Sequence, residues 1–363
     1  MMEKILKVAL IGCGGVANAA HIPAWAAMPR VQVVAVCDLI AERAAAAAER
    51  LGVAPSGIYT DYKQVLALPE VDAVDICTPN YMHSVIAVDA LNAGKHVFCE
   101  KPDAVSVAEA TRMKQAAEQS GKVLMVMRNN RYHNASAYLK QYIKDGRMGE
   151  VYAARCGWIR RRGIPGKGGW FTTKALSGGG PLIDLGVHMI DLTLWLMGNP
   201  RPVAVSGCTY TKFAQSGPQE SIHSSFGDAK ADGVFDVEDL AMGFIRLDNG
   251  ACIQIEFSWA SNIGKERVFV ELRGTKAGSC WDADEGTLNI FSEEYGRLQD
   301  STPITGIQGL ENHATNLRHF TEVLLDGVEP MFVPQQGVDM IAILEAMYRS
   351  AELGREVRLE ELQ

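Results

Sequence analysis

A glycine-rich turn near the N-terminus constrains the fold of this chain more than any other feature. Gly12-Cys13-Gly14-Gly15-Val16-Ala17 follows the apolar run Lys7–Ile11 and precedes a helical pattern, Val16–Met28. In G-x-G-x-x-A, the glycines permit a tight turn and close approach to a pyrophosphate, and the small last residue lets helix and strand pack. Glycine-rich turns also occur without a cofactor. The pattern predicts a dinucleotide site at Gly12, Gly14, Gly15, Val16 and Ala17.

Short β-branched runs alternate with helical patterns over the first 130 residues. Further strands are predicted at Val31–Cys37, Val71–Thr78, His96–Cys99 and Val123–Met127, and helices at Glu42–Leu51, Ser84–Ala93 and Ala108–Ser120. Such alternation is typical of a parallel α/β sheet. We therefore expect an α/β protein whose residues 1–130 form a dinucleotide-binding Rossmann domain.

After residue 130, predicted strands follow one another without a helix between most of them. They cover Val151–Arg161, Val203–Thr211, Glu238–Leu247, Ala251–Ala260, Arg267–Arg273 and Thr287–Phe291. Asp248-Asn249-Gly250 predicts a hairpin. Helices are expected at Ala135–Lys144, through Trp195, and at Ala314–Leu325 and Gln336–Leu353. Residues 131–363 should form a substrate-binding and oligomerisation α+β domain with a large, mostly antiparallel open sheet, and the C-terminal helix could pack back on the first domain.

The composition excludes several classes of protein. The net charge of −8 argues against nucleic-acid and anionic-membrane partners. The eight cysteines include no C-x-x-C pair, which favours a reducing compartment over disulfides or a zinc site. The sequence shows neither a signal-peptide pattern nor an apolar stretch of about 20 residues. We expect a soluble, cytoplasmic protein without a metal.

Asp38 bears on the choice of cofactor. It follows the second predicted strand, where a carboxylate can bind the adenosine ribose hydroxyls. A carboxylate there disfavours a 2′-phosphate, so NAD is expected rather than NADP, although Arg43 lies nearby. Asp38 could also cap the helix that follows, or serve both roles.

Two further motifs carry a resemblance to a known family. Cys99-Glu100-Lys101-Pro102 follows a predicted strand, and Gly178-Gly179-Gly180-Pro181-Leu182-Ile183-Asp184-Leu185-Gly186-Val187-His188 opens a helix. Together with the glycine turn, Thr78-Pro79-Asn80 with His83, and Asn129-Asn130-Arg131-Tyr132, they resemble the glucose-fructose oxidoreductase / inositol dehydrogenase / MocA family over nearly the whole chain.

The resemblance implies an NAD-dependent oxidoreductase. Hydride would pass between the nicotinamide and a secondary alcohol carbon of a sugar, inositol or glycoside. Carried over position by position, Lys101, Asp184 and His188 form the catalytic group. The nicotinamide-ribose side would be lined by Thr78, Pro79, Asn80, His83 and Glu100, and Lys101 and Asn129 complete the expected cofactor set.

These residue types suit alcohol oxidation, which needs a base for the hydroxyl proton while hydride leaves the carbon. Asp184 and His188 are spaced i, i+4 and would share a helix face. Lys101 follows a strand, where open α/β sheets bind ligands, and its ammonium could stabilise an alkoxide. The residues leave open whether Lys101 or His188 takes the proton; we favour His188. Taken alone, Lys101 could be a surface charge and His188 a partly buried structural residue.

Substrate contacts are expected from residues near the catalytic motifs. The candidates are Arg131, Tyr132, Arg160, Arg162, Trp170 and His313. On a strand, Arg160 and Arg162 would share a face, which could equally be a solvated one. Trp170 could instead be a packing residue. Gly163–Gly169 could act as a specificity loop.

The leading hypothesis is an NAD-dependent dehydrogenase of a ring hydroxyl, with C3 of a glycoside as one option. An NAD-assisted glycoside hydrolase or lyase that oxidises C3 transiently is the alternative, and a non-catalytic nucleotide or sugar sensor is a third. A homodimer or homotetramer is expected through the C-terminal sheet. Alternating residues in Met242–Leu247 and Ile253–Trp259 would fit that interface.

Overall fold

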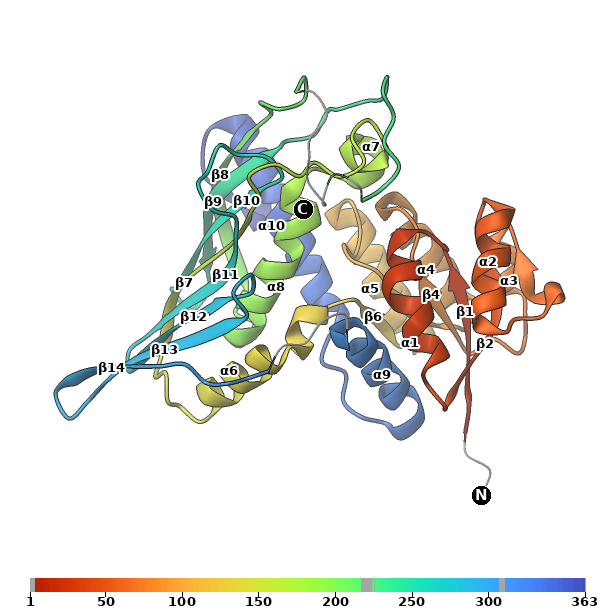
Figure 1. Cartoon of the computed structure of the whole chain (residues 1–363), viewed down its shortest axis with the longest axis horizontal. Helices are drawn as coiled ribbons and strands as arrows, with labels where there is room; N and C mark the ends of the chain where they lie inside the picture. The colour runs from red at the N-terminus through yellow and green to blue at the C-terminus, as the bar shows by residue number, and fades with distance from the viewer. Residues whose placement is uncertain (1–3, 217–223, 225, 307–310, 363) are drawn as a thin grey trace. The chain divides into compact units, whose positions relative to one another are not determined.

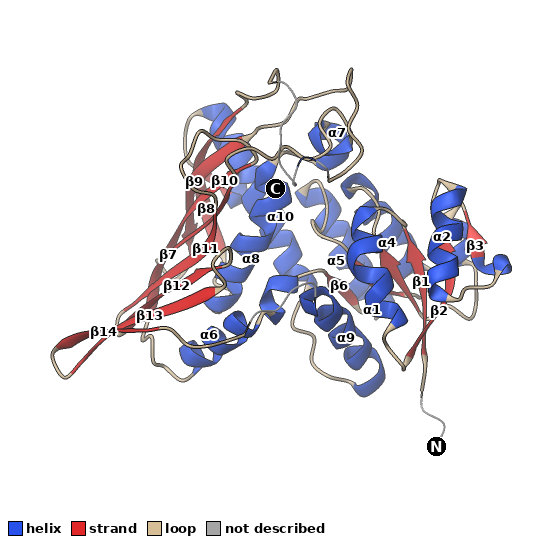
Figure 2. Ribbon diagram, in the orientation of Figure 1, coloured by secondary structure: helices blue, strands red, loops and turns tan. Residues whose placement is uncertain are grey.

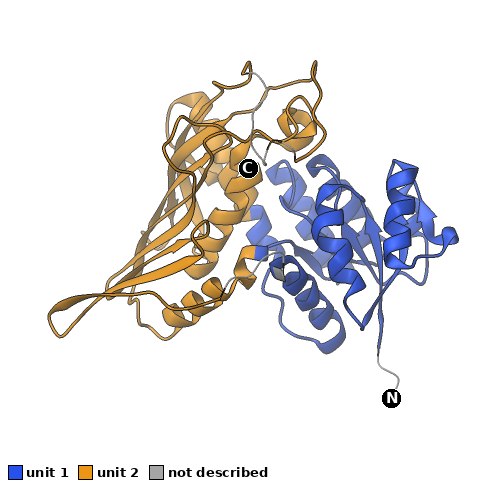
Figure 3. Cartoon of the chain, viewed as in Figure 1, with its two compact units in different colours: residues 1–129, 309–338 blue, residues 130–308, 339–363 orange. Residues whose placement is uncertain are grey.

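The computed structural model describes residues 4–216, 224, 226–306 and 311–362. The chain forms two compact units (Figure 3). The first unit comprises residues 1–129 and 309–338, and the second comprises residues 130–308 and 339–363. No helix among the described residues has the length and apolar character needed to cross a membrane.

The first unit contains a six-stranded parallel sheet with the order β3-β2-β1-β4-β5-β6. The strands are β1 (Leu6–Ile11), β2 (Val31–Cys37), β3 (Ile58–Tyr59), β4 (Ala73–Ile76), β5 (His96–Cys99) and β6 (Leu124–Val126). The chain leaves β1 in one direction and crosses back to β4 on its other side. Ligands bind outside the carboxyl ends of strands at such a switch point. The predicted Rossmann sheet is confirmed.

The helices of the first unit connect these strands (Figure 1). They are η1 (Ala17–His21), α1 (Ile22–Ala26), α2 (Ala41–Leu51), η2 (Pro55–Gly57), α3 (Tyr62–Leu66), η3 (Asn80–Met82), α4 (His83–Asn92), α5 (Val107–Ser120) and α9 (Glu311–Asp326). The helix predicted over Val16–Met28 begins as a π-helical turn, η1, before the α-helical turns of α1. The late segment α9 packs against η1 and α1 within this unit.

The second unit is built on a nine-stranded sheet with the order β14-β13-β12-β11-β7-β10-β9-β8-β15 (Figure 2). The strands are β7 (Val151–Ile159), β8 (Pro202–Tyr210), β9 (Leu240–Leu247), β10 (Cys252–Ser258), β11 (Arg267–Gly274), β12 (Ala277–Asp282), β13 (Thr287–Glu294), β14 (Arg297–Ser301) and β15 (Val357–Arg358). Among the strand pairs described in this nine-stranded sheet, only β7–β10 is parallel. The mostly antiparallel sheet and the β9–β10 hairpin are confirmed.

One face of this sheet is covered by helices. The helical segments that lie wholly in the second unit are α6 (Asn134–Lys144), η5 (Trp170–Thr172), α7 (Lys174–Ser177), η6 (Leu182–Gly186), α8 (Val187–Leu196) and η8 (Leu359–Leu362). Two more helices start in the first unit and continue into the second: η4 (Asn129–Tyr132) enters it at residue 130, and α10 (Pro334–Leu353) enters it at residue 339. Gly207 and Gly243 let Met347 of α10 approach, because an added Cβ would lie 1.8 and 2.4 Å from its side chain.

The covered face holds most of the residues that the sequence assigned to an oligomer interface. Ile245, Ile253 and Phe257 are buried there, and Trp259 is also fully buried. Phe244 points to the opposite face, because successive side chains of a strand alternate, and 48% of its surface is exposed. The predicted alternation of side chains is present, but the buried apolar residues form the core under the helices rather than the open face of the sheet.

Candidate active site

The glycine turn after β1 combines a steric constraint with an open approach. Gly12 has a φ of +93°, and a Cβ added to it would lie 2.6 Å from the carbonyl carbon of Cys77. A Cβ on Gly14 would meet no protein atom within 4 Å. The Asn18 amide donates to the carbonyl oxygens of Cys13 and Gly14 at 2.8 and 2.9 Å. The turn is therefore held from within, and its open side can receive a pyrophosphate.

Asp38 connects the end of β2 to this turn. Its carboxylate accepts hydrogen bonds from the backbone N–H groups of Cys13 and Ile40, each at 2.8 Å. Asp38 is not the N-cap of α2, because Ile40 holds that position without a side-chain cap; the Asp38 carboxylate instead bonds the backbone of the N-cap residue itself. Its carboxylate also lies at the glycine turn, where a ribose diol would complete its remaining acceptor sites. The ribose contact stays a prediction.

His83 joins the loops that follow β4 and β5. Its Nδ1 lies 2.7 Å from the Pro102 carbonyl oxygen and its Nε2 lies 2.8 Å from that of Thr78. Burial lowers the pKa of His83. The predicted residues Pro79 and Asn80 lie between Thr78 and His83, so the T-P-N and E-K-P motifs are structurally coupled.

Two buried polar atoms near the strand ends have no hydrogen-bond partner among the residues that the structure describes. They are the Thr78 hydroxyl oxygen and the Asn129 side-chain oxygen. Buried polar groups normally form hydrogen bonds. Both residues were predicted to bind the cofactor, and both follow strands at the ligand-binding edge of the sheet. Together with the open side of Gly14, they fit a bound dinucleotide.

Glu100 and Lys101 directly follow β5. The backbone N–H of Lys101 donates to Glu100 Oε2 at 3.0 Å, and the Lys101–Pro102 peptide bond is cis. Glu100 Oε1 lies 2.8 Å from Nε2 of His21, a residue that the sequence did not single out. His313, predicted for the substrate, lies on α9 in this unit, and burial lowers its pKa.

Asp184 and His188 belong to a different set of contacts, in the second unit. Asp184 lies in the π-helical turn η6 and accepts a 3.0 Å hydrogen bond from Nε1 of Trp259. His188 lies in α8, with its ring 5.9 Å from that of Trp158 between centroids. The Arg160 guanidinium lies 5.3 Å from the same tryptophan ring. The structure therefore brings together a carboxylate, an imidazole, a guanidinium and two aromatic rings.

The two arginines that were predicted to contact substrate, Arg160 and Arg162, have different surroundings. Burial lowers the pKa of Arg160, while the charges of Asp184 and Glu266 raise it. Arg162 instead donates to Asn262 Oδ1 at 2.7 Å and lies over the ring of Phe213. Strand β7 ends at residue 159, before either arginine, so the strand alternation that predicted a shared face does not extend to them.

The glycines before Asp184 make room for protein groups. Buried Glu238 accepts from the backbone N–H groups of Gly180 (2.9 Å) and Leu182 (3.1 Å) and from the Tyr348 hydroxyl (3.0 Å). A Cβ on Gly179 would lie 2.0 Å from the Tyr348 oxygen, and one on Gly180 would lie 2.0 Å from the Glu238 carbonyl oxygen. These two glycines position the turn that carries Asp184, a role that the sequence alone did not indicate.

Replacing Gly180 by alanine should therefore destabilise the protein. Overpacking of this kind costs about 1–3 kcal/mol, and the Glu238 backbone has little freedom to move. Thermal unfolding would measure the loss, with Gly264→Ala as the control because a Cβ there meets no atom within 4 Å. Equal melting temperatures for the two variants would contradict the proposed close packing.

The remaining predicted substrate residues have structural contacts. The guanidinium of Arg131 is buried and bonds both oxygens of Asp191, at 2.8 and 2.6 Å. Asp191 is in α8, so this ion pair anchors the helix that carries His188. Tyr132 follows in the same short helix, η4. Trp170 stacks on Phe171 with a centroid distance of 3.9 Å.

Comparison with known proteins places these features in one family. Residues 6–128 match the oxidoreductase family with an NAD-binding Rossmann fold, and residues 136–279 match the GFO/IDH/MocA C-terminal domain. The chain belongs to the Gfo/Idh/MocA oxidoreductase family. It is therefore an oxidoreductase that binds NAD through its N-terminal Rossmann fold, as the sequence predicted.

Relatives in this family cover the chain almost completely. D-glucoside 3-dehydrogenase of Escherichia coli is 32% identical over 99% of both chains. Levoglucosan dehydrogenase of Pseudarthrobacter phenanthrenivorans is 32% identical over 83% of this chain and 80% of its own. A solved levoglucosan dehydrogenase in complex with NADH and levoglucosan has a TM-score of 0.85 at 26% identity, over 98% of this chain and 100% of that one.

Proposed function

We propose that this chain is an NAD-dependent dehydrogenase that oxidises a secondary ring hydroxyl of a sugar or glycoside, with C3 of a glucoside as the leading position. The observation that best supports this proposal is the cluster of Asp184 and His188 with two tryptophans in the second unit. The similarity to D-glucoside 3-dehydrogenase over 99% of both chains supports the glucoside and the C3 position. The levoglucosan dehydrogenase likeness supports the sugar class.

The proposed mechanism assigns one task to each side chain. His188 takes the hydroxyl proton while the C–H bond breaks, and a ketone forms. Asp184, oriented by Trp259, accepts a hydrogen bond from substrate or from His188. The Lys101 ammonium stabilises the developing alkoxide. When bound, the nicotinamide ring supplies the hydride acceptor, so one C–H bond and one O–H bond are lost for each ketone formed.

We also propose that residues 1–130 serve the nucleotide and residues 131–363 serve the substrate. The first compact unit supports this division, although it also includes residues 309–338 and therefore His313. In the second unit, the Trp158 ring lies beside His188, and an indole ring supplies a large apolar surface against which a sugar ring can pack. Tyr132, Arg162 and Trp170 remain predicted substrate residues.

A screen for NAD reduction tests this function. We expect steady NADH formation with a methyl glucoside, and none with its 3-deoxy analogue, because the reacting hydroxyl is then missing. Oxidation of the 3-deoxy sugar at an equal rate would contradict the C3 assignment. Release of the aglycone without net NADH would instead support the glycoside hydrolase or lyase alternative.

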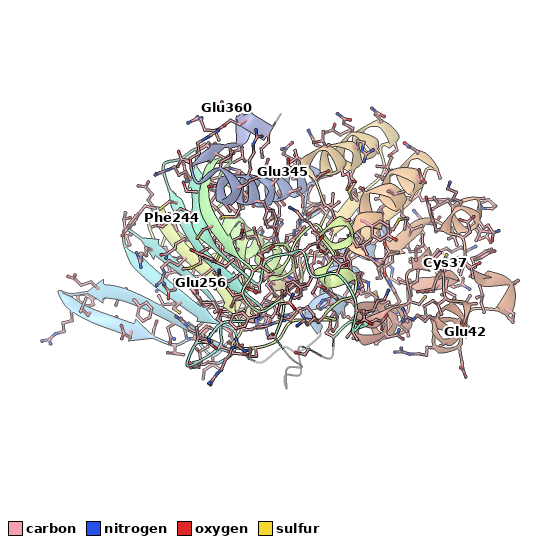
Figure 4. All side chains as sticks on the ribbon, turned by 90° about the horizontal axis from the view of Figure 1, so that it is seen from above. Cys37, Glu42, Phe244, Glu256, Glu345 and Glu360 are labelled. Carbon is pink, nitrogen blue, oxygen red and sulfur yellow. The ribbon has the colours of Figure 1, made fainter. Side chains whose placement is uncertain are left out.

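We further propose that the open face of the nine-stranded sheet joins copies of this chain into a dimer or tetramer. Phe244, Tyr210 and Phe291 are exposed at 48%, 44% and 43%, and the strand register places them on this face. Figure 4 labels Phe244 and Glu256, which lie on neighbouring strands of this face. The apolar rings therefore alternate with charged side chains.

Phe244→Lys should shift the assembly toward monomers, because it places a charge in the proposed interface. Light scattering at micromolar concentration would measure the mass. Val328→Lys, at an apolar residue that is 42% exposed in the first unit, serves as the control and should leave the mass unchanged. A monomeric unmodified protein would rule out the proposed assembly.

A further inference from the structure

A row of charged side chains lies buried in the first unit, centred on His21. The ring of His21, in η1, is fully buried. Its Nδ1 lies 2.8 Å from Asp75 Oδ2, and its Nε2 lies 2.8 Å from Glu100 Oε1. Trp25 Nε1 donates to the same Asp75 oxygen at 2.6 Å. The imidazole therefore bridges the carboxylate of Asp75 in β4 and that of Glu100, which directly follows the neighbouring strand β5.

The contacts of His21 favour a charged ring, because both of its acceptors are carboxylates. Each nitrogen of His21 faces a carboxylate oxygen, and a neutral imidazole can donate through only one nitrogen. Burial alone would lower the pKa of His21, but the charge of Asp75 raises it well above its ordinary value. Burial would likewise raise the pKa of Glu100, but the hydrogen bond and charge of His21 hold it well below its usual range.

A metal ion is the alternative occupant of this position. His21, Asp75 and Cys77 have ligand atoms within 4.8 Å of one another, the one such group among the described residues. However, both His21 nitrogens already face carboxylates, and burial raises the pKa of the Cys77 thiol, which favours the protonated form. A metal needs the deprotonated thiolate and a free imidazole nitrogen. The contacts therefore favour an ion-paired imidazolium.

The ion pairs lead directly to Lys101. Glu100 uses one carboxylate oxygen for His21 and the other for the backbone N–H of Lys101. A buried carboxylate held at both oxygens cannot rotate without breaking a charge-assisted hydrogen bond. Removing the imidazolium would leave Asp75 and Glu100 as buried charges without their shared cation, which is strongly unfavourable.

We propose that His21 is a positioning residue for Lys101, acting as a permanent imidazolium that fixes Glu100 and, through it, the backbone of the E-K-P turn. The proposal rests on the role proposed above for Lys101. His21 does not contact the reacting atoms. It fixes the position and the ionisation state of Glu100, the residue that precedes Lys101. Three separate segments of the chain meet to form this support.

The charge of this cluster should stay constant through the neutral pH range. The groups that face His21 and Glu100 are Asp75 and Cys77 from the β4 side, Lys101 beside Glu100, and His313 from α9. The raised pKa of His21 gives stability that is lost only as pH rises through that value. The lowered pKa of Glu100 gives stability that is lost only as pH falls through its folded value.

His21→Gln tests the proposal by removing the cation while keeping a hydrogen-bonding group. We expect kcat to fall about 10- to 100-fold, as for a misplaced catalytic group, while the Kd for NAD changes by less than about threefold. Burial of Glu100 is then opposed only by the charges of His313 and Lys101, so its pKa rises and a new ionisation enters the acid limb of the kcat profile. Arg30→Gln, which removes a surface ion pair with Asp326, is the control and should show neither effect.

A second measurement does not depend on the folding of a variant. In ¹⁵N NMR of the unmodified protein, His21 should show both ring nitrogens protonated between about pH 6 and 9, where a free histidine loses its proton. A neutral His21 ring, or a His21→Gln enzyme with unchanged kcat and pH profile, would overturn the proposal. Failure of the proposed function would show differently, as no NADH formed from any sugar by the unmodified protein.

Discussion

Replacing Gly14 by alanine should weaken NAD binding strongly while leaving the fold stable. A Cβ at this position meets no protein atom within 4 Å, so folding should tolerate it. The same Cβ would project toward the side of the turn that a pyrophosphate approaches. We expect the Kd for NAD to rise at least about tenfold, which corresponds to about 1.4 kcal/mol.

Gly12→Ala should show the opposite behaviour. Gly12 has a φ of +93°, and its Cβ would lie 2.6 Å from the backbone of Cys77. We expect this variant to unfold at lower temperature by more than Gly14→Ala, since both strain and overlap oppose it. Calorimetric titration with NAD and thermal unfolding measure the two effects. Gly14→Ala with unchanged NAD affinity would contradict the assignment of this turn to the pyrophosphate.

Loss of the His188 imidazole should have the largest effect on catalysis. General-base catalysis contributes about 10²- to 10⁴-fold to a rate, so we expect His188→Ala to lower kcat within that range. The Kd for NAD should not change, because the residues that fit the nucleotide belong to the first unit. Stopped-flow measurement of NADH formation gives the rate. A variant with wild-type kcat would remove His188 from the mechanism.

Trp259→Phe offers a finer test of the same cluster. It removes the indole N–H that bonds Asp184 but keeps an aromatic ring. We expect a smaller fall in kcat, about 3- to 10-fold, typical of one lost hydrogen bond. Trp281→Phe is a matched control, because the buried Trp281 Nε1 has no hydrogen-bond partner. If both variants lose activity equally, the bond to Asp184 has no special role.

Most of the fold could be predicted because strands and helices carry local patterns. His96–Cys99 was predicted to the residue, and the Asn249-Gly250 hairpin was predicted from its turn. The sequence does not predict strand β12, since Gly278 and Ser279 interrupt its apolar pattern, although it pairs with β13 over its whole length and with β11 from Gly278 onward. Tertiary pairing stabilises such a strand, and a local pattern does not reveal it.

The candidate site likewise contains residues that local motifs indicate and residues that they do not. Lys101, Asp184 and His188 could be proposed as catalytic residues from the sequence because they lie in short motifs. His21 could not, because its partners Asp75 and Glu100 lie 54 and 79 residues away. Such pairs depend on the order of strands in the sheet rather than on spacing along the chain.

Hydride transfer from a sugar carbon to NAD can be followed with an isotope label. A methyl glucoside that carries deuterium at C3 would be incubated with the protein and NAD, and the NADH analysed by mass spectrometry. We expect NADH that contains one deuterium and a 3-keto glycoside in equal amount. Unlabelled NADH formed from the same sugar would contradict the C3 assignment, and no NADH from any sugar would contradict the proposed function.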